Sequence, residues 1–374
     1  MAVSYNRLWK LLGDKKRTMK TKEKEFRIFS GDRPKVLLLG NGLCRAYDGM
    51  SWDQLLDEIK DKKAFPHPAR NYLLPMPLKA AMLANNTLSR KLREIATEGI
   101  TGDLHTEKTT WKNFVCTTEE MRSQICRLVN CGFDYILTTN YSYEIEAALL
   151  GEETLGPQRI SKLMNFHEVD HAQTQFLINT FNQVGGIPIW HIHGEARKPG
   201  SMVLGHYYYG KLLRRCVARL DGTKEVTEDK HPAYFGKEKE FSRNFKMRRP
   251  QKIGSWIDAF VLGDVYILGF GMDFSEADLW WLIEYKRNHP EFCGRTIFLE
   301  PEKDNTTTCE YDHTTMCVNM KNYIRADQCK HLLLRETYGV DIDSLDVTIQ
   351  RTEDYRQFYR KAIKEIERGK YAKS

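Results

Sequence analysis

The sequence has no uninterrupted apolar run that approaches the ~20 residues needed by a membrane-spanning helix. Residues 1–18, MAVSYNRLWKLLGDKKRT, also lack a sustained apolar segment followed by a small-residue cleavage site, so we expect no signal peptide. Of the 374 residues, 41% are hydrophobic and 29% are charged, which is enough apolar material for a sizeable core. These features predict a cytoplasmic protein that is not attached to a membrane.

The nine cysteines include no Cys-x-x-Cys pair. Their odd number and irregular spacing favour reduced, packed thiols over a disulfide framework. A four-cysteine zinc site would need two close ligand pairs, and these are missing. The sequence also has no Gly-x-Ser-x-Gly elbow, Walker P-loop, His-Glu-x-x-His motif or kinase signature. The commonest hydrolase and phosphotransferase classes are therefore excluded.

The charge balance is only moderately basic, with a net charge of +7. Basic residues gather at 15–24 and 243–252, where they could contact phosphates or an acidic partner. Neither cluster has the interleaved aromatic residues of a single-strand binder. We interpret both clusters as solvated surface and expect no direct binding of nucleic acid.

Six short runs, rich in apolar and β-branched residues, are predicted to be strands. They are Lys35–Leu39, Phe133–Thr138, Ile187–His193, Asp264–Leu268, Arg295–Leu299 and Leu345–Gln350. Several lack apolar–polar alternation, which is typical of parallel strands buried on both faces. Helical patterns lie between the runs, and we expect Ser51 and Ser275 to cap two of these helices. The sequence thus predicts an α/β protein with a Rossmann-like, doubly wound parallel sheet.

Two of the intervals between strands are too long for simple connections. We expect helical insertions there, at about 66–130 and 205–252, and the first should form a small helical subdomain. The predicted organisation is a basic N-terminal arm at 1–30, one main α/β domain at 31–350 and a C-terminal helix at 351–374.

Two Gly-x-Gly motifs follow predicted strands. The first comprises Gly40, Asn41 and Gly42, and the second comprises Gly269, Phe270 and Gly271. In open α/β sheets, ligands bind at the carboxyl ends of strands, and glycines let a phosphate approach the backbone amides. The first motif is not the full dinucleotide fingerprint, because residue 45 is arginine. Tight turns are the alternative interpretation of both motifs.

Polar residues follow two further predicted strands. Thr138 and Thr139 precede Asn140, which could orient a water molecule or hold a sugar hydroxyl, or could instead be a helix N-cap. His191 and His193 are two apart, so in a strand they would share one face. His193 precedes a glycine and is suited to acid–base chemistry, although a structural role is an alternative. No third ligand for a metal is obvious nearby.

Taken in order, these blocks resemble those of the sirtuin superfamily. More narrowly, they resemble the sirtuin-like NAD hydrolases of bacterial anti-phage defence, such as the Thoeris effector and the sirtuin-like partner of HerA-type ATPases. The resemblance spans about residues 35–287. It implies a Rossmann-type NAD-binding domain, homo-oligomerisation and a HerA-type ATPase as a partner.

The resemblance also implies roles for individual residues. Asn140 would contact the nicotinamide ribose and position the attacking water, and His193 would be the catalytic histidine. The motif at 40–42 would be the first phosphate loop, and the motif at 269–271 would lie near the adenosine end. Thr138 and Thr139 would line the NAD site beside Asn140.

Two departures from the family patterns bear on function. Protein deacylases of the superfamily usually carry a four-cysteine zinc module, which this chain lacks, and defence members often have aspartate where Ser142 stands. The resemblance therefore implies an NAD⁺ hydrolase that depletes the cell of NAD⁺, with NAD⁺ as its substrate and no metal. The alternatives are a protein deacylase or ADP-ribosyltransferase, and a non-catalytic subunit that binds NAD or ADP-ribose.

Overall fold

The fold is described from a computed structural model of the chain. It covers residues 33–49, 75–84, 118–152, 164–165, 178, 181–195, 201–221, 253, 255–302 and 330–371. The predicted basic arm, both basic clusters and Ser51 lie outside these residues. No helix within these ranges is long and apolar enough to cross a membrane.

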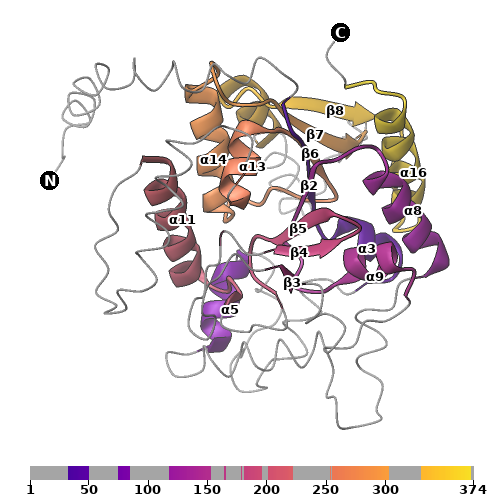
Figure 1. The fold of residues 1–374 in the computed structure, drawn as a ribbon, viewed down its shortest axis with the longest axis horizontal. Helices are drawn as coiled ribbons and strands as arrows, with labels where there is room; N and C mark the ends of the chain where they lie inside the picture. Colours follow the sequence, from indigo (N-terminus) through magenta and orange to yellow (C-terminus); the bar gives the residue numbers. More distant parts are fainter. Residues whose placement is uncertain are drawn as a thin grey trace, which may run out of the picture.

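An eight-stranded sheet lies at the centre, in the order β3-β4-β5-β2-β1-β6-β7-β8 (Figure 1). The strands are β1 (Lys35–Leu39), β2 (Tyr135–Thr138), β3 (Met164–Asn165), β4 (Phe181–Val184), β5 (Ile187–His191), β6 (Asp264–Leu268), β7 (Thr296–Pro301) and β8 (Asp341–Leu345). From β5 to β8 all neighbouring pairs are parallel, whereas β3 and β4 extend the sheet in antiparallel fashion.

The six parallel strands have the strand order of a Rossmann fold. The chain runs from β1 to β2 and β5 on one side, and then returns across β1 to add β6, β7 and β8 on the other. This order confirms the predicted doubly wound α/β class. The strand order reverses between β1 and β6, and ligands of such sheets bind outside the carboxyl ends of the strands at that point.

Helices cover both faces of the sheet (Figure 1). One face carries α11 (His206–Asp221), α13 (Trp256–Leu262) and α14 (Ala277–Asn288), and the other carries α3 (Gly42–Ala46), α8 (Glu119–Val129), α9 (Glu144–Leu150) and α16 (Asp354–Glu367). Two further elements are α5 (Met76–Ala84) and the π-helical turn η3 (Leu333–Thr337). The helix α16 lies within the C-terminal helix predicted at 351–374.

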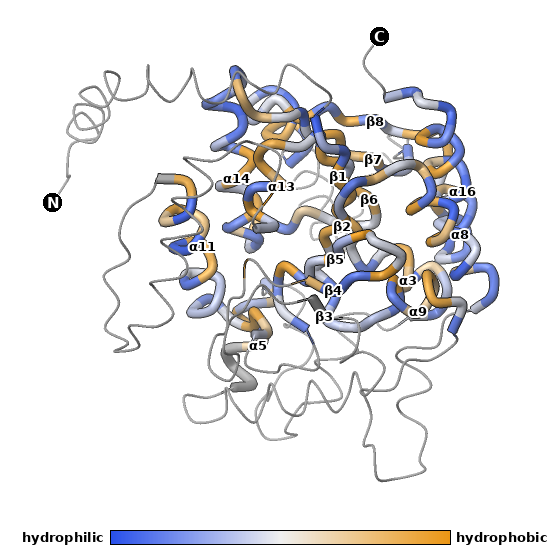
Figure 2. Tube along the Cα trace, in the orientation of Figure 1, coloured by the Kyte–Doolittle hydropathy of each residue, from blue (hydrophilic) through white to orange (hydrophobic). Residues whose placement is uncertain are grey.

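The central strands supply apolar side chains to both helical layers. In β1, Val36 and Leu38 pack with one cluster of buried residues, and Leu37 and Leu39 pack with the other. All four are at most 1% exposed, and Figure 2 shows the central strands as hydrophobic. Burial of such a side chain is worth roughly 1.5–3 kcal/mol, so β1 holds the two layers together.

The predicted last strand, at 345–350, is wrong: β8 covers Asp341–Leu345 instead. It pairs only with β7, so it is an edge strand and needs no continuous apolar run. The apolar residues that prompted the prediction, Val347 and Ile349, pack beyond the strand in the cluster that includes α16. Among the long intervals, α5 and α8 lie within 66–130 and α11 within 205–252, while the helical subdomain stays a prediction.

Candidate active site

The two predicted catalytic residues lie just beyond the carboxyl ends of neighbouring strands. Thr138 ends β2 and is in register with His191, which ends β5. The Ile192 N–H donates to the Thr138 carbonyl oxygen at 2.9 Å, which keeps the two chains together past the sheet. Asn140 and His193 each follow two residues later and are 5% and 2% exposed. Both therefore lie at the same edge, shielded from bulk water.

Asn140 is held by local contacts, while its amide oxygen has no partner among the described residues. Its backbone N–H donates to Thr138 Oγ1 at 3.1 Å, and its Nδ2 lies 3.7 Å from the sulfur of Cys44 in α3. Its Oδ1 is buried without a hydrogen bond from any described residue. A buried acceptor left unpaired costs roughly 1–3 kcal/mol, so this oxygen is suited to accept a bond from a ligand. The N-cap alternative is wrong, because α9 begins at Glu144 with Tyr143 as its N-cap residue.

His191 contacts the backbone of Asn140 and does not share a face with His193. Its Nδ1 lies 2.6 Å from the carbonyl oxygen of Asn140, and its Nε2 lies 2.9 Å from Glu146 Oε1, which also accepts from Asn182 at 2.8 Å. Burial lowers the pKa of His191, but the charge and hydrogen bond of Glu146, together with the Glu195 charge and the Asn140 carbonyl, outweigh this effect and bring the pKa to about 9. The expected common face is wrong because β5 ends at His191, so the strand alternation does not reach His193.

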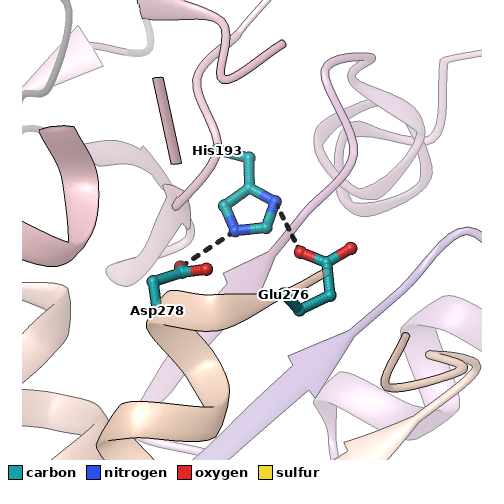
Figure 3. Close-up of side chains that lie close together, drawn as sticks. All are labelled: His193, Glu276 and Asp278. Carbon is teal, nitrogen blue, oxygen red and sulfur yellow. Dashed lines mark hydrogen bonds and ion pairs between the residues drawn. The ribbon is translucent and has the colours of Figure 1, made fainter. Parts of the chain in front are cut away.

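His193 lies between two carboxylates from the start of α14 (Figure 3). Its Nε2 lies 3.0 Å from Asp278 Oδ2, and its Nδ1 lies 3.7 Å from Glu276 Oε2. Tyr209 of α11 donates to the same Glu276 oxygen at 2.9 Å, and its ring packs edge-on against the imidazole. Three side chains from two helices thus fix the orientation of this histidine.

The electrostatics of this cluster favour proton exchange near neutral pH. Burial lowers the pKa of His193, but the charges of Asp278 and Glu276 outweigh it and leave the pKa raised. Burial raises the pKa of Glu276 to about 7. When His193 is neutral, the short contact assigns its Nε2–H as a donor to Asp278, which leaves Nδ1 as the basic nitrogen. A carboxylate that orients a histidine in this way also stabilises its protonated form.

Gly194 allows the chain to turn directly after His193. It has φ +92°, and a Cβ at this position would lie 2.2 Å from the carbonyl oxygen of Ser201. The Val203 N–H donates to the His193 carbonyl oxygen at 2.8 Å, so the two segments pack closely. A glycine is therefore required for His193 to keep its place.

We expect Gly194→Ala to lower the melting temperature and to reduce activity, because both the backbone angle and the clash displace His193. A non-glycine residue in such a conformation costs roughly 1–3 kcal/mol before any clash is counted. Gly186→Ala is the matched control, because Gly186 has φ +86° but nothing within 4 Å of an added Cβ. Equal losses of stability in the two variants, measured by thermal unfolding, would contradict the role of the Ser201 contact.

The two Gly-x-Gly motifs pack directly against each other at the ends of β1 and β6. The Gly40 N–H donates to the Leu268 carbonyl oxygen at 3.0 Å, and the Gly42 N–H donates to the Gly269 carbonyl oxygen at 2.7 Å. A Cβ on Gly40 would lie 2.4 Å from the Gly269 oxygen. These glycines permit a close approach of two loops, and both amides are already engaged. Phosphate binding by the motifs stays a prediction.

The other predicted NAD-binding residues surround the same edge. Thr138 and Thr139 are buried and directly precede Asn140 in the chain. Asn41 directly precedes α3, the helix that brings Cys44 to Asn140. Phe270 packs against the cluster that contains α14. The carbonyl oxygen of Gly271 accepts a hydrogen bond from Lys330 Nζ at 2.8 Å.

A metal was not expected here, because no third ligand could be recognised near the two histidines. The structure places His193, Glu276 and Asp278 so that one ligand atom of each lies within 4.8 Å of the others. These are ligand types that bind divalent cations. However, the two carboxylates approach different nitrogens of the ring, as Figure 3 shows, so they flank the imidazole on two sides. This arrangement suits a hydrogen-bonded relay better than convergence on one ion.

Sequence reasoning missed Glu276, Asp278 and Tyr209. They lie far from His193 along the chain, and only the packing of α11 and α14 on one face of the sheet brings them to it. A signal was present, since acidic residues directly after a glycine motif at a strand end lie at the ligand-binding edge. Ser275 was predicted to cap α14. That prediction is wrong, because its N–H and hydroxyl both bond Asp273 Oδ1 and Glu276 is the N-cap residue.

Comparison with known proteins adds no further assignment: no protein-family model matches the chain, and no curated protein matches it.

Proposed function

We propose that this protein is an NAD⁺ glycohydrolase that cleaves the bond between nicotinamide and ribose. The observation that carries the proposal is the pairing of Asn140, with its unpartnered buried oxygen, and His193, held between two carboxylates, at the carboxyl edge of a Rossmann-type sheet. The order of the four motifs, which resembles that of sirtuin-like NAD hydrolases, supports the choice of substrate.

Each residue has a role that follows from its position. Cleavage passes through an oxocarbenium-like state, as in glycoside hydrolysis, and nicotinamide leaves as a neutral ring without a general acid. Asn140 Oδ1 would accept a hydrogen bond from a ribose hydroxyl or from the attacking water. His193 Nδ1 would remove a proton from that hydroxyl or water, and Asp278 would stabilise the resulting imidazolium. Water and NAD⁺ would give nicotinamide, ADP-ribose and one proton.

The burial of Asn140 and His193 has two consequences for this chemistry. Exclusion of bulk water strengthens the electrostatic interactions between His193 and its carboxylates. A dinucleotide reaches side chains that are 5% and 2% exposed only after part of their cover moves.

A freely active hydrolase would also deplete the cell that makes it, so we propose restraint through a homo-oligomer or a partner such as a HerA-type ATPase.

The proposed reaction is tested by incubating the protein with NAD⁺, with and without an acetyl-lysine peptide, and separating the products by chromatography. We expect ADP-ribose and nicotinamide in both samples at equal rates. Acetyl-ADP-ribose with concurrent deacetylation of the peptide would instead assign a deacylase. ADP-ribose attached to the protein or peptide would assign a transferase.

Metal removal should leave the reaction unchanged. We expect nicotinamide release to persist after dialysis against EDTA, because Asp278 and Glu276 each contact a separate ring nitrogen and leave His193 as a base. Untreated protein dialysed in the same buffer is the control. Loss of activity that returns on addition of Zn²⁺, Mn²⁺ or Mg²⁺ would contradict this prediction and assign the cluster to a metal.

A further inference from the structure

A cavity lies at the opposite edge of the sheet from Asn140 and His193. It has a volume of about 400 Å³ and is formed by the end of α14, the start of β7 and the turn η3. The β7 start lies beside the start of β6, because Val265 and Thr296 are in register. A five-residue strand spans about 16 Å, so this cavity is well separated from the carboxyl edge.

The cavity is strongly basic. Its lining includes five cationic side chains and one carboxylate, that of Glu336. The cationic residues are Arg33, Lys286, Arg287, Arg295 and Arg335. Like charges are gathered at a cost that a bound anion would relieve.

Lys286 places a buried cationic group beside the cavity. Its Nζ donates to the carbonyl oxygens of Phe260 at 2.9 Å, Gly263 at 3.0 Å and Arg295 at 3.0 Å. All three of its donors are thus used, and the side chain is held in one position. Burial lowers the pKa of Lys286 to about 7, because the ammonium group has lost its hydration and its three hydrogen bonds are to neutral carbonyl oxygens. Lys286 would therefore act on a ligand through its charge and not through a direct bond.

The arginines differ in how far their charges are balanced. Arg335 bonds Glu336 at 2.8 Å, and Arg295 lies 3.7 Å from a carboxylate oxygen of Asp264. Within the described part of the chain, Arg287 has no carboxylate partner. Arg33 donates to the carbonyl oxygen of Phe292 at 2.9 Å. The guanidinium of Arg287 is therefore the best placed to meet a ligand.

We propose that this cavity binds a small oligophosphate, such as pyrophosphate or the phosphate chain of a nucleoside diphosphate or triphosphate. Guanidinium groups bind phosphate oxygens in bidentate fashion, and four arginines line this cavity. The volume lies in the range of small-molecule pockets, and a pocket of this size takes a compact ligand and not an extended nucleic-acid backbone. The inference does not depend on the proposed NAD⁺ hydrolysis.

The test is calorimetric titration of the protein with sodium pyrophosphate, and then with ADP. We expect saturable binding of both, weakened at least about tenfold in R287E/R335E, because each lost charge-assisted contact contributes to affinity. Arg351→Glu is the matched control, since its side chain is 76% exposed and Arg351 does not line the cavity. Its binding should equal that of the unmodified protein. If R287E/R335E fails to fold by circular dichroism, Arg287→Gln should show the same direction of change.

Three outcomes would overturn the proposal. One is the absence of saturable pyrophosphate binding in the unmodified protein. A second is binding that is unchanged in the folded charge variants but lost in Asn140→Ala, which would assign the anion to the carboxyl edge. A third is tighter binding of a short single-stranded RNA than of pyrophosphate. If this RNA binding were lost in R287E/R335E, the cavity would be assigned to nucleic acid.

Discussion

Replacement of His193 by alanine is expected to lower the rate of nicotinamide release by roughly 10²–10⁴-fold, the usual contribution of a general base. The reason is that, among the described residues, no other imidazole lies between Asp278 and Glu276 to act as the base. The fold should persist, because Glu276, with a pKa of about 7, can take up a proton when the imidazole is removed. The measurement is nicotinamide release under saturating NAD⁺.

His206→Ala is the control for this substitution. His206 is exposed at the start of α11, so its removal should change neither the rate nor the melting temperature. Normal turnover by a folded His193→Ala protein would contradict the assignment of His193 as the base.

Replacement of Asp278 by asparagine is expected to lower the maximal rate at least about tenfold and to move the acid limb of the pH profile to lower pH. The negative charge of Asp278 is one of the groups that raise the pKa of His193. A base acts only when deprotonated, so activity rises as pH passes the His193 pKa from below. Removal of the charge lowers that pKa, and the rise therefore begins at lower pH.

The profile of kcat against pH measures this shift, and Asp346→Asn provides the control. The Asp346 side chain is 90% exposed, so that variant should keep both the rate and the acid limb of the unmodified protein. An acid limb that moves to higher pH in Asp278→Asn would show that His193 is not the group that titrates. A purely structural role of Asp278 would lower the rate without moving the limb.

The parts of the fold that could be predicted were those in which local composition is decisive. Strands β1 and β6 have the predicted bounds, because runs such as KVLLL must be buried on both faces of a sheet. The edge strand β8 was placed wrongly, since its composition is set by one neighbour and by solvent and not by a core. The antiparallel β3 and β4 were not predicted, because FNQV carries too few apolar residues for a recognisable pattern.

The candidate site, like the fold, could be predicted from the sequence only in part. Asn140 and His193 could be located because each lies close to the end of a strand, and the ends of parallel strands meet at one edge. The carboxylates that set the pKa of His193 could not, because their position depends on how α14 packs against the sheet. The different environments of His191 and His193 could not be foreseen either, since they depend on where β5 ends.

The central claim is tested most directly by incubating the purified protein with NAD⁺ beside Asn140→Ala and its control Asn288→Ala, and separating the products by chromatography. Asn288 is exposed at the end of α14. We predict release of nicotinamide and ADP-ribose by the unmodified protein and by Asn288→Ala, and its loss in Asn140→Ala. If none of the three releases products, calorimetric titration with NAD⁺ follows, and tight binding that Asn140→Ala lacks would place NAD⁺ at Asn140 and direct the search to an activating partner. Absence of both release and NAD⁺ binding in the unmodified protein would contradict the account.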